Sequence, residues 1–215
     1  MEACERDWRE HEENFSRNLS VLQENMCRER IWYCKEITTM RIILEPKFFD
    51  RLALKVGRAL LGKYLVRVSG GKEIALPIME VEVYDGFADR ASHAYRGKTT
   101  RNQVMFGDAG HLYVYFVYGM YWMLNVVVGK KNYPAAILIR SVGDFKGPGK
   151  LTKELQIDKK LNGKIAEPAS GLWFEDRGFR FRRGKKIWHI KKLPRVGVHY
   201  AGPEWSKKLY RFLLE

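Results

Sequence analysis

The chain contains 215 residues, with 39 lysines and arginines against 25 aspartates and glutamates, and its formal net charge is +14. This length suits one compact domain with an appendage and is too short for two domains of typical size. No apolar run is long enough to span a bilayer, and the charged opening differs from a signal peptide. We therefore expect an intracellular protein with no membrane partner, in the cytoplasm or nucleoid of a bacterium or the nucleus of a eukaryote.

The excess of positive charge is confined to the chain after residue 40. Residues 1–40 hold nine acidic and six basic side chains, whereas residues 41–215 hold 33 basic and 16 acidic ones, a net charge of +17. Such an excess favours binding to a polyanion such as nucleic acid, although a basic surface without that function is the alternative. The three cysteines all lie within the first 34 residues and match no zinc spacing, so we predict reduced thiols, no metal site and no cofactor.

The chain is predicted to consist of an amphipathic helical extension, residues 1–40, and a main domain, residues 41–215. Apolar residues recur at a helical spacing from Trp8 to Met26, with charged residues between them, which predicts a helix over residues 5–30. The stripe would dock on the main domain or on a partner. In a third interpretation the segment is dispensable, because Met40 precedes the first globular-looking sequence.

The main domain begins with a predicted helix from Pro46, ended by Gly62. Two strands, over residues 63–68 and 73–84, follow and are joined by the turn sequence Ser69-Gly70-Gly71.

The second of these strands carries an unusual pattern of acidic residues. Glu80, Glu82 and Tyr84 alternate with apolar residues and so project from one face, and a short loop then leads to His93. The apolar face would pack in a core, so the acidic face lines a cleft, meets solvent or is paired with cations. An ordinary edge strand with a solvated acidic face is the simpler alternative.

Residues 112–128 form two apolar and aromatic runs interrupted near Gly119, which predicts a buried hairpin. Tyr118, Met120 and Tyr121 then lie at its tip, where polar residues are usual. Either a neighbouring loop covers them, or they form a wedge that enters stacked bases.

Two polar residues interrupt the apolar runs. Asn125 lies within the second run of the hairpin and, if buried, must be hydrogen-bonded to backbone or to a ligand. Arg140 closes the predicted strand AAILIR and needs a carboxylate partner, for which Glu80 and Glu82 are candidates.

Three polar or basic stretches are candidates for phosphate contact. Residues 96–102, with Thr99 and Arg101, form either a phosphate-binding or a solvated loop. The sequence from Gly147 to Lys150 opens a predicted helix, whose free amides can hold a phosphate. Residues 179–192 alternate aromatic and basic side chains and predict a strand that binds the nucleic-acid backbone nonspecifically; His189 and His199 are interpreted as structural.

The motifs, in their order, resemble the alkyladenine (3-methyladenine) DNA glycosylases. The resemblance extends from about Phe48 to Phe212, and each motif is short, but their order and spacing together are specific. It is carried by EVEVY with the following His93, TTRN, LYVYFVYGMYWMLNV, AAILIR, GPGKLTKEL, LWFEDRG and RVGVHYAGPEW.

This resemblance implies a role for each matching residue in turning a damaged purine out of duplex DNA and cleaving its bond to deoxyribose. Glu82 matches the general base that activates water, and Arg140 and the main-chain carbonyl of Val196 match groups that hold that water. The remaining matches are Tyr84, His93 and Tyr115 as walls of the base pocket, Asn125 as a screen for exocyclic groups, Tyr118 as the intercalating residue, and Met105, Met120 and Tyr121 as its neighbours at the DNA surface.

The sequence also departs from the family. The connection between Arg140 and the Gly-Pro-Gly motif is shorter than is usual, and Ala94-Tyr95 replaces the small residues expected after His93. No lysine stands out as an amine nucleophile, since Lys98 and Lys150 lie in polar or glycine-rich stretches, so we expect hydrolysis without strand cleavage.

We predict a single α+β domain with a curved, mainly antiparallel sheet and peripheral helices, following the N-terminal extension. The leading functional hypothesis is a monomeric, monofunctional glycosylase of base excision repair that removes alkylated or deaminated purines from double-stranded DNA. The alternatives are a noncatalytic binder of bent or damaged DNA and a hydrolase of free nucleosides.

Overall fold

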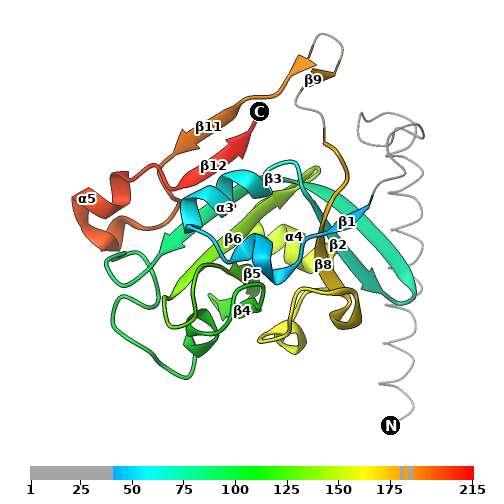
Figure 1. Ribbon diagram of the computed structural model, residues 1–215. Coiled ribbons are helices and arrows are strands. Elements are labelled where there is room, and N and C mark those ends of the chain that lie inside the picture. The colour runs from blue at the N-terminus through cyan, green and yellow to red at the C-terminus, as the bar shows by residue number, and fades with distance from the viewer. Residues whose placement is uncertain (1–40, 180–181, 184–185) are drawn as a thin grey trace. The chain divides into compact units, whose positions relative to one another are not determined.

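A computed structural model describes residues 41–179, 182–183 and 186–215. Within these residues ten strands form one sheet in which all pairings are antiparallel (Figure 1). The predicted α+β domain with a mainly antiparallel sheet is confirmed for this part of the chain. The strands of the sheet are β1 (Ile42–Ile43), β2 (Tyr64–Ser69), β3 (Lys72–Asp85), β4 (Leu112–Val117), β5 (Tyr121–Val127), β6 (Ala135–Val142), β7 (Phe145–Lys146), β8 (Leu172–Asp176), β11 (Ile190–Leu193) and β12 (Arg211–Leu214).

The long strand β3 organises the sheet. Its first half pairs with β2, and its second half pairs with β12 on one side and β6 on the other. The register with β6 shifts between Ile78 and Val81, an irregularity that bends a strand and increases its twist. The alternative of an edge strand with a solvated acidic face is therefore wrong, because the segment that carries Glu80 and Glu82 has partners on both sides.

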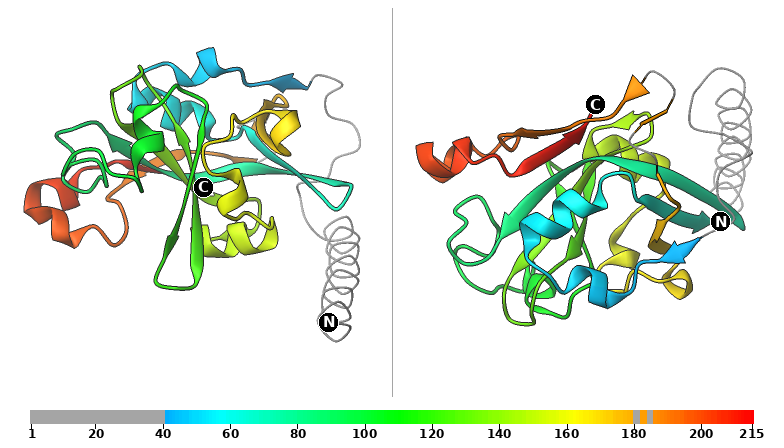
Figure 2. Two further views of the ribbon diagram at one scale, coloured as in Figure 1. Left: turned by 90° about the horizontal axis from the view of Figure 1, so that it is seen from below. Right: turned by 45° about the horizontal axis from the view of Figure 1, so that its top comes forward.

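Helices lie at the periphery of the sheet (Figures 1 and 2). Helix α3 (Ala53–Leu60) packs on β3 and β6, and α4 (Pro148–Glu154) packs on β5 and β6. The close approach of α3 depends on Gly57, because a Cβ at that position would lie 2.6 Å from Cγ2 of Val83. The apolar side of β3, which includes Val83, is thereby buried under α3. Glu82 and Tyr84, the residues before and after Val83, project from the opposite face of the strand.

The helix predicted from Pro46 is divided into two. Helix α2 (Pro46–Phe49) is followed by its C-cap Asp50, and α3 begins after Leu52, whose ψ of 130° is not helical. Nε of Arg51 donates to the carbonyl of Phe48 at 2.7 Å and so satisfies an acceptor at the end of α2. The prediction of one continuous helix is wrong at this point. It correctly places the end at Gly62, which adopts a left-handed φ of 78°.

Strands β4 and β5 form the predicted hairpin, which projects from the body in the left view of Figure 2. Tyr118 and Gly119 both have positive φ, 52° and 67°, and the amide of Met120 donates to the carbonyl of Val117 at 3.1 Å. These are features of the tight turns that match the twist of a hairpin. A tyrosine in the left-handed region is strained, and such strain concentrates at functional sites.

Two predicted segments differ from expectation or lie outside the described residues. The stretch 179–192 is not one strand: β9 (Arg182–Arg183) pairs antiparallel with β10 (Lys186–Ile187), so the chain reverses before β11. The alternating charge indicated extended backbone but carried no signal for the reversal. The helix predicted within residues 1–40 lies outside the described residues. Across residues 41–215, as far as they are described, no helix is long and apolar enough to cross a membrane.

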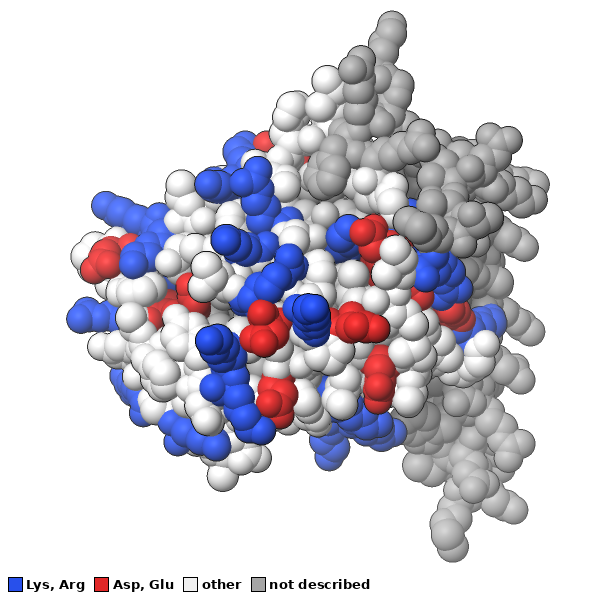
Figure 3. All heavy atoms as spheres, in the orientation of Figure 1, with Lys and Arg blue, Asp and Glu red and all other residues white. Residues whose placement is uncertain are grey.

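Basic side chains cover more of the face seen in Figure 3 than acidic ones do. They are interspersed with acidic groups and do not form one continuous stripe on this face. On this face the basic side chains are therefore dispersed, and contacts of lysine and arginine with a nucleic-acid backbone do not depend on sequence.

The remaining regular elements are short. A six-residue helix, α5 (Gly202–Lys207), precedes β12. The 3₁₀ helices are η1 (Gln103–Phe106), η2 (Lys159–Leu161), η3 (Pro168–Ser170) and η4 (His199–Ala201).

Candidate active site

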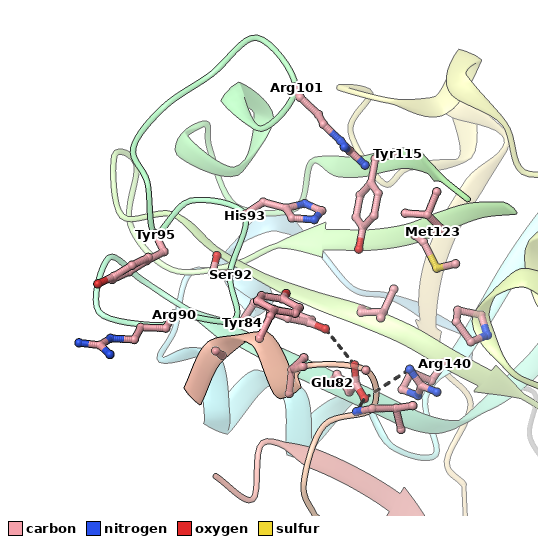
Figure 4. A pocket seen from close by; sticks show the side chains of 18 of the residues that line it. Glu82, Tyr84, Arg90, Ser92, His93, Tyr95, Arg101, Tyr115, Met123 and Arg140 are labelled. Carbon is pink, nitrogen blue, oxygen red and sulfur yellow. Dashed lines mark hydrogen bonds and ion pairs between the residues drawn. The ribbon is translucent and has the colours of Figure 1, made fainter. Parts of the chain in front are cut away.

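A cleft of about 1010 Å³ opens beside the second half of β3. Its walls come from β3, β4 and β6, from the loop that follows β3 and from the segment that precedes α5 (Figure 4). Glu82 lies at the bottom of this cleft, and its side chain is fully buried. The face of β3 that carries the acidic residues therefore lines a cleft, as one of the interpretations of the sequence proposed.

The carboxylate of Glu82 is held by three groups. Oε2 accepts a hydrogen bond from the hydroxyl of Tyr84 at 3.0 Å, and Oε1 accepts one from the amide of Val196 at 2.7 Å and lies 3.3 Å from Nη1 of Arg140 (Figure 4). Burial raises the pKa of Glu82 above its ordinary value, while Arg140, the Val196 amide and the Tyr84 hydroxyl oppose that rise. A carboxylate with a raised pKa is a stronger base than one in water.

Arg140 joins the two carboxylates of β3, as the sequence predicted. Its Nε lies 3.3 Å from Oε1 of Glu80, and its Nη1 reaches Glu82. Glu80 receives a second cation, because Nη1 of Arg211 lies 2.8 Å from the same oxygen. This arrangement compensates Glu80 with two arginines and leaves Glu82 as the carboxylate that lines the cleft.

Three rings surround the space above Glu82. Tyr84, His93 and Tyr115 all line the cleft, and the His93 and Tyr115 rings meet edge to face with centroids 4.6 Å apart. Nδ1 of His93 lies 3.0 Å from the hydroxyl of Tyr113, which fixes the ring. Burial and the nearby Arg101 lower the pKa of His93, so this ring is neutral at physiological pH.

A smaller cavity of about 50 Å³ continues behind these rings, and Asn125 forms part of its wall. Asn125 is 2% exposed, and its amide nitrogen donates to the carbonyls of Tyr113 and Met123 at 3.0 and 3.4 Å. Because both partners are acceptors, they fix the orientation of the amide. Among the described residues, none donates to its Oδ1. The prediction of a buried, hydrogen-bonded asparagine is confirmed.

A protein-family model named Methylpurine-DNA glycosylase matches residues 47–146 and 143–215, which include every residue of this site. The chain belongs to the methylpurine-DNA glycosylase family. It is therefore a DNA repair hydrolase that acts on N-glycosyl bonds, and the resemblance inferred from the ordered motifs is confirmed.

Curated relatives support the same assignment. Proteins named "Putative 3-methyladenine DNA glycosylase" from Legionella pneumophila (strain Paris), Methanocella arvoryzae and Borreliella afzelii are 41%, 41% and 38% identical. The alignments cover 82%, 75% and 80% of this chain and 96%, 88% and 96% of the relatives.

The hairpin of the glycosylase exposes apolar side chains at its tip. Tyr118 is 83% exposed and Met120 is 62% exposed, so no part of the described chain covers them. Tyr121, at 43% exposure, packs against α4 beside Gly149, where a Cβ would lie 2.6 Å from its ring. The alternative of a covering loop is wrong for Tyr118 and Met120 within the described residues.

Met105 does not lie at the surface of the glycosylase, in contrast to the prediction. It is 2% exposed and packs in a cluster with Phe106 and Tyr113. The reason is the 3₁₀ helix η1, whose turn directs Met105 inward, where it contributes to the wall of the small cavity.

The residues predicted to contact phosphate have different surroundings in the structure. Arg101 lines the cleft, with its guanidinium 5.4 Å from the centroid of the Tyr115 ring and its Nη2 donating to the carbonyl of Phe116 at 3.0 Å. Thr99 exchanges hydrogen bonds with Asn102 and so shapes its own loop. Lys150 is exposed on α4, which begins after Gly147 as predicted.

Sequence reasoning missed two features of this site in the glycosylase. Tyr200 lines both the cleft and the small cavity, and its hydroxyl donates to the carbonyl of Ala91 at 2.8 Å. Arg195 and Asp89 form a fully buried ion pair beneath the Tyr84 ring. Each residue stands in a motif or loop already singled out, but spacing alone cannot indicate which residues of separate loops meet.

Proposed function

We propose that this glycosylase turns alkylated or deaminated purines out of double-stranded DNA and hydrolyses their bond to deoxyribose with a water molecule activated by Glu82. The observation that carries the proposal is a buried carboxylate at the bottom of an aromatic-walled cleft, next to an exposed tyrosine on a hairpin tip. The enzyme acts as a monomer on damaged DNA.

In the proposed reaction, water attacks C1′ of the deoxyribose and gives a proton to Glu82. The bond between C1′ and the base nitrogen breaks, and its electron pair leaves with the base. Positive charge develops on the sugar before the new bond is complete, and the Glu82 carboxylate stabilises that charge. Arg140 opposes protonation of Glu82 and so keeps it ready to accept the proton.

Two further groups complete the reaction centre. The resemblance assigned the carbonyl of Val196 to the attacking water, and its amide N–H already holds Glu82. We infer that Arg140 and the Val196 carbonyl hold the water between Glu82 and the sugar. Tyr118 fills the space that the everted nucleotide leaves in the duplex, which offsets part of the lost stacking.

The cleft favours a purine that carries positive charge. The faces of Tyr84 and Tyr115 are electron-rich, and a cationic alkylated purine stacks on them more strongly than a neutral base. His93, neutral at physiological pH, adds no repulsion to such a base. Asn125 screens the exocyclic groups that reach the small cavity.

The basic residues of the cleft support the proposal of hydrolysis without strand cleavage. Among the described residues that line the cleft, the basic ones besides His93 are arginines, and no lysine amine is positioned to attack the sugar. Guanidinium groups stay protonated and are poor nucleophiles. We therefore expect the product to be an abasic site in an intact strand.

The test is base release from duplexes that carry 3-methyladenine, 7-methylguanine, hypoxanthine or ethenoadenine. We expect release from at least one duplex without strand breaks, and we expect Glu82→Gln to abolish release while it retains affinity for duplex DNA with an abasic site. Arg41→Met, which removes an ion pair with Glu73 and Glu175 on the β8 side of the sheet, is the matched control. Affinity without any product would refute the proposal and support a noncatalytic binder.

A further inference from the structure

Arg195 and Asp89 form an ion pair whose side chains are both fully buried. Nη1 and Nη2 of the arginine lie 2.5 and 2.8 Å from the two carboxylate oxygens, so the pair is bidentate. Nη1 also donates to the carbonyl of Val83 at 2.8 Å. Since burying two charges is costly, a pair of this kind persists only with good geometry and further hydrogen bonds. Neither residue belongs to the reaction described above.

Asp89 determines the course of the loop between β3 and His93. Its Oδ2 accepts a hydrogen bond from the amide of Asp85 at 3.1 Å, and its Oδ1 accepts one from the amide of Ala91 at 3.0 Å. The carboxylate therefore ties the beginning of the loop to its middle. His93 follows two residues after Ala91, so its approach to the cleft depends on this anchor.

Arg195 connects that loop to two groups that contact or surround Glu82. Its guanidinium carbon lies 4.8 Å from the centroid of the Tyr84 ring and 5.2 Å from that of Tyr210. It directly precedes Val196, whose amide donates to Glu82 at 2.7 Å. One side chain thus supports an aromatic wall from below and fixes the backbone that holds the carboxylate.

We propose that the Arg195–Asp89 pair positions the active site. The pair holds Tyr84, the His93 loop and the Val196 amide in their places around Glu82. The pair lies outside the cleft and acts through these three groups, without touching the base or the water. This inference rests on the proposed function. Its expected signature is a slower chemical step with DNA binding preserved, because the hairpin tip and the exposed cations make no contact with the pair.

The test uses Arg195→Lys and Asp89→Asn in the full chain. Arg195→Lys keeps the charge but loses the planar fork, and Asp89→Asn keeps the size but loses the charge. Arg177→Met is the control, because it breaks an ion pair with Glu175 at 2.6 Å on β8. For each protein we would measure thermal unfolding, the single-turnover rate of hypoxanthine or 7-methylguanine release at saturating enzyme, and the Kd for duplex DNA with an abasic site.

We expect the release rate to fall on the order of 100-fold in both variants, since small displacements of reacting groups cost that much. We expect the abasic-site Kd to stay within about threefold, since backbone contacts dominate affinity. Arg177→Met should keep the wild-type rate. If one variant does not fold, the release rate and Kd of the other variant test the positioning role.

Wild-type rates in folded Arg195→Lys or Asp89→Asn would overturn the positioning role, as would equal losses of rate and affinity. No release by the wild type would instead overturn the proposed function and this inference with it.

Discussion

The hydroxyl of Tyr84 donates a hydrogen bond across 3.0 Å to Oε2 of Glu82. The two residues are two positions apart on β3 and therefore share the face that lines the cleft. The ring that would stack on the everted base and the carboxylate that would activate water are thus linked directly. A change at Tyr84 should affect both the stacking surface and the ionisation of Glu82.

Tyr84→Phe separates these two effects. The variant keeps the ring but removes a hydrogen bond that lowers the pKa of Glu82, so that pKa rises. The acidic limb of the single-turnover rate should move to higher pH, while the rate on the alkaline plateau stays close to that of the wild type. Burial raises the pKa of Tyr84 well above 10, so its own ionisation does not contribute.

The measurement is a pH–rate profile between about pH 5 and 9. Tyr133→Phe is the control, because the Tyr133 hydroxyl donates to Asp85 and Tyr133 is not among the residues that line the cleft. If the midpoint of the acidic limb is unchanged in Tyr84→Phe, or shifts equally in both variants, the proposed link between Tyr84 and the pKa of Glu82 is wrong.

Glu82→Gln should stabilise the folded protein at neutral pH. Burial raises the pKa of Glu82 in the folded state, so this state binds the proton more tightly than the unfolded chain does. The stability contributed by protonated Glu82 is present below the unfolded pKa and is lost as pH rises through the folded pKa. Arg140 retains Glu80 as a partner in the variant.

A calorimetric series should therefore show a Tm a few degrees above the wild type at neutral pH, where each unit of pKa shift corresponds to about 1.4 kcal/mol. The difference should vanish at acidic pH. A lower Tm at neutral pH would show that the hydrogen bonds of the ionised carboxylate outweigh its burial.

Period-two alternation was sufficient to predict the acidic face of β3, because side chains of a strand alternate whatever its neighbours. The sequence could also assign Arg140 to a carboxylate, since a cation in an apolar strand must be compensated. The placement of Met105 at the DNA surface came from the family resemblance and was wrong, because the direction of this side chain depends on η1.

Contacts between separate loops could not be predicted. Arg195 is 106 residues from Asp89 along the chain, and nothing in the local pattern of either residue indicates their pairing. The break between α2 and α3 was missed for a related reason. The residues around Asp50 include no proline or glycine that would mark a break, yet the chain leaves the helix there, and Phe49 before the break and Val56 after it are both buried in the core.

Tyr118→Ala tests the hairpin tip as a wedge. The side chain is 83% exposed, so its loss should leave the Tm nearly unchanged. Stacking of an aromatic ring on a base contributes about 1–3 kcal/mol, so release from duplex DNA should fall by about 5- to 150-fold. Release from single-stranded DNA should be much less affected, because no stacked gap must be filled.

The comparison is made with single-turnover rates on the two forms of DNA. Leu52→Ala, which truncates a 69% exposed apolar residue outside the hairpin, should leave both rates unchanged. Equal losses on duplex and single strand would exclude a wedge and indicate a contact with the base itself.

Lys150→Ala tests whether α4 contacts the DNA backbone beside the hairpin. Lys150 is exposed and follows Gly149, which packs on the ring of Tyr121 near the hairpin tip. Removal of one phosphate contact should weaken binding equally for all sequences and reduce the slope of log K against log salt by about one. Titrations of labelled duplex at several salt concentrations give this slope. Lys55→Ala, exposed on α3 against the opposite side of β3, should leave the slope unchanged, so a similar reduction in both variants would indicate diffuse attraction rather than a contact made by α4.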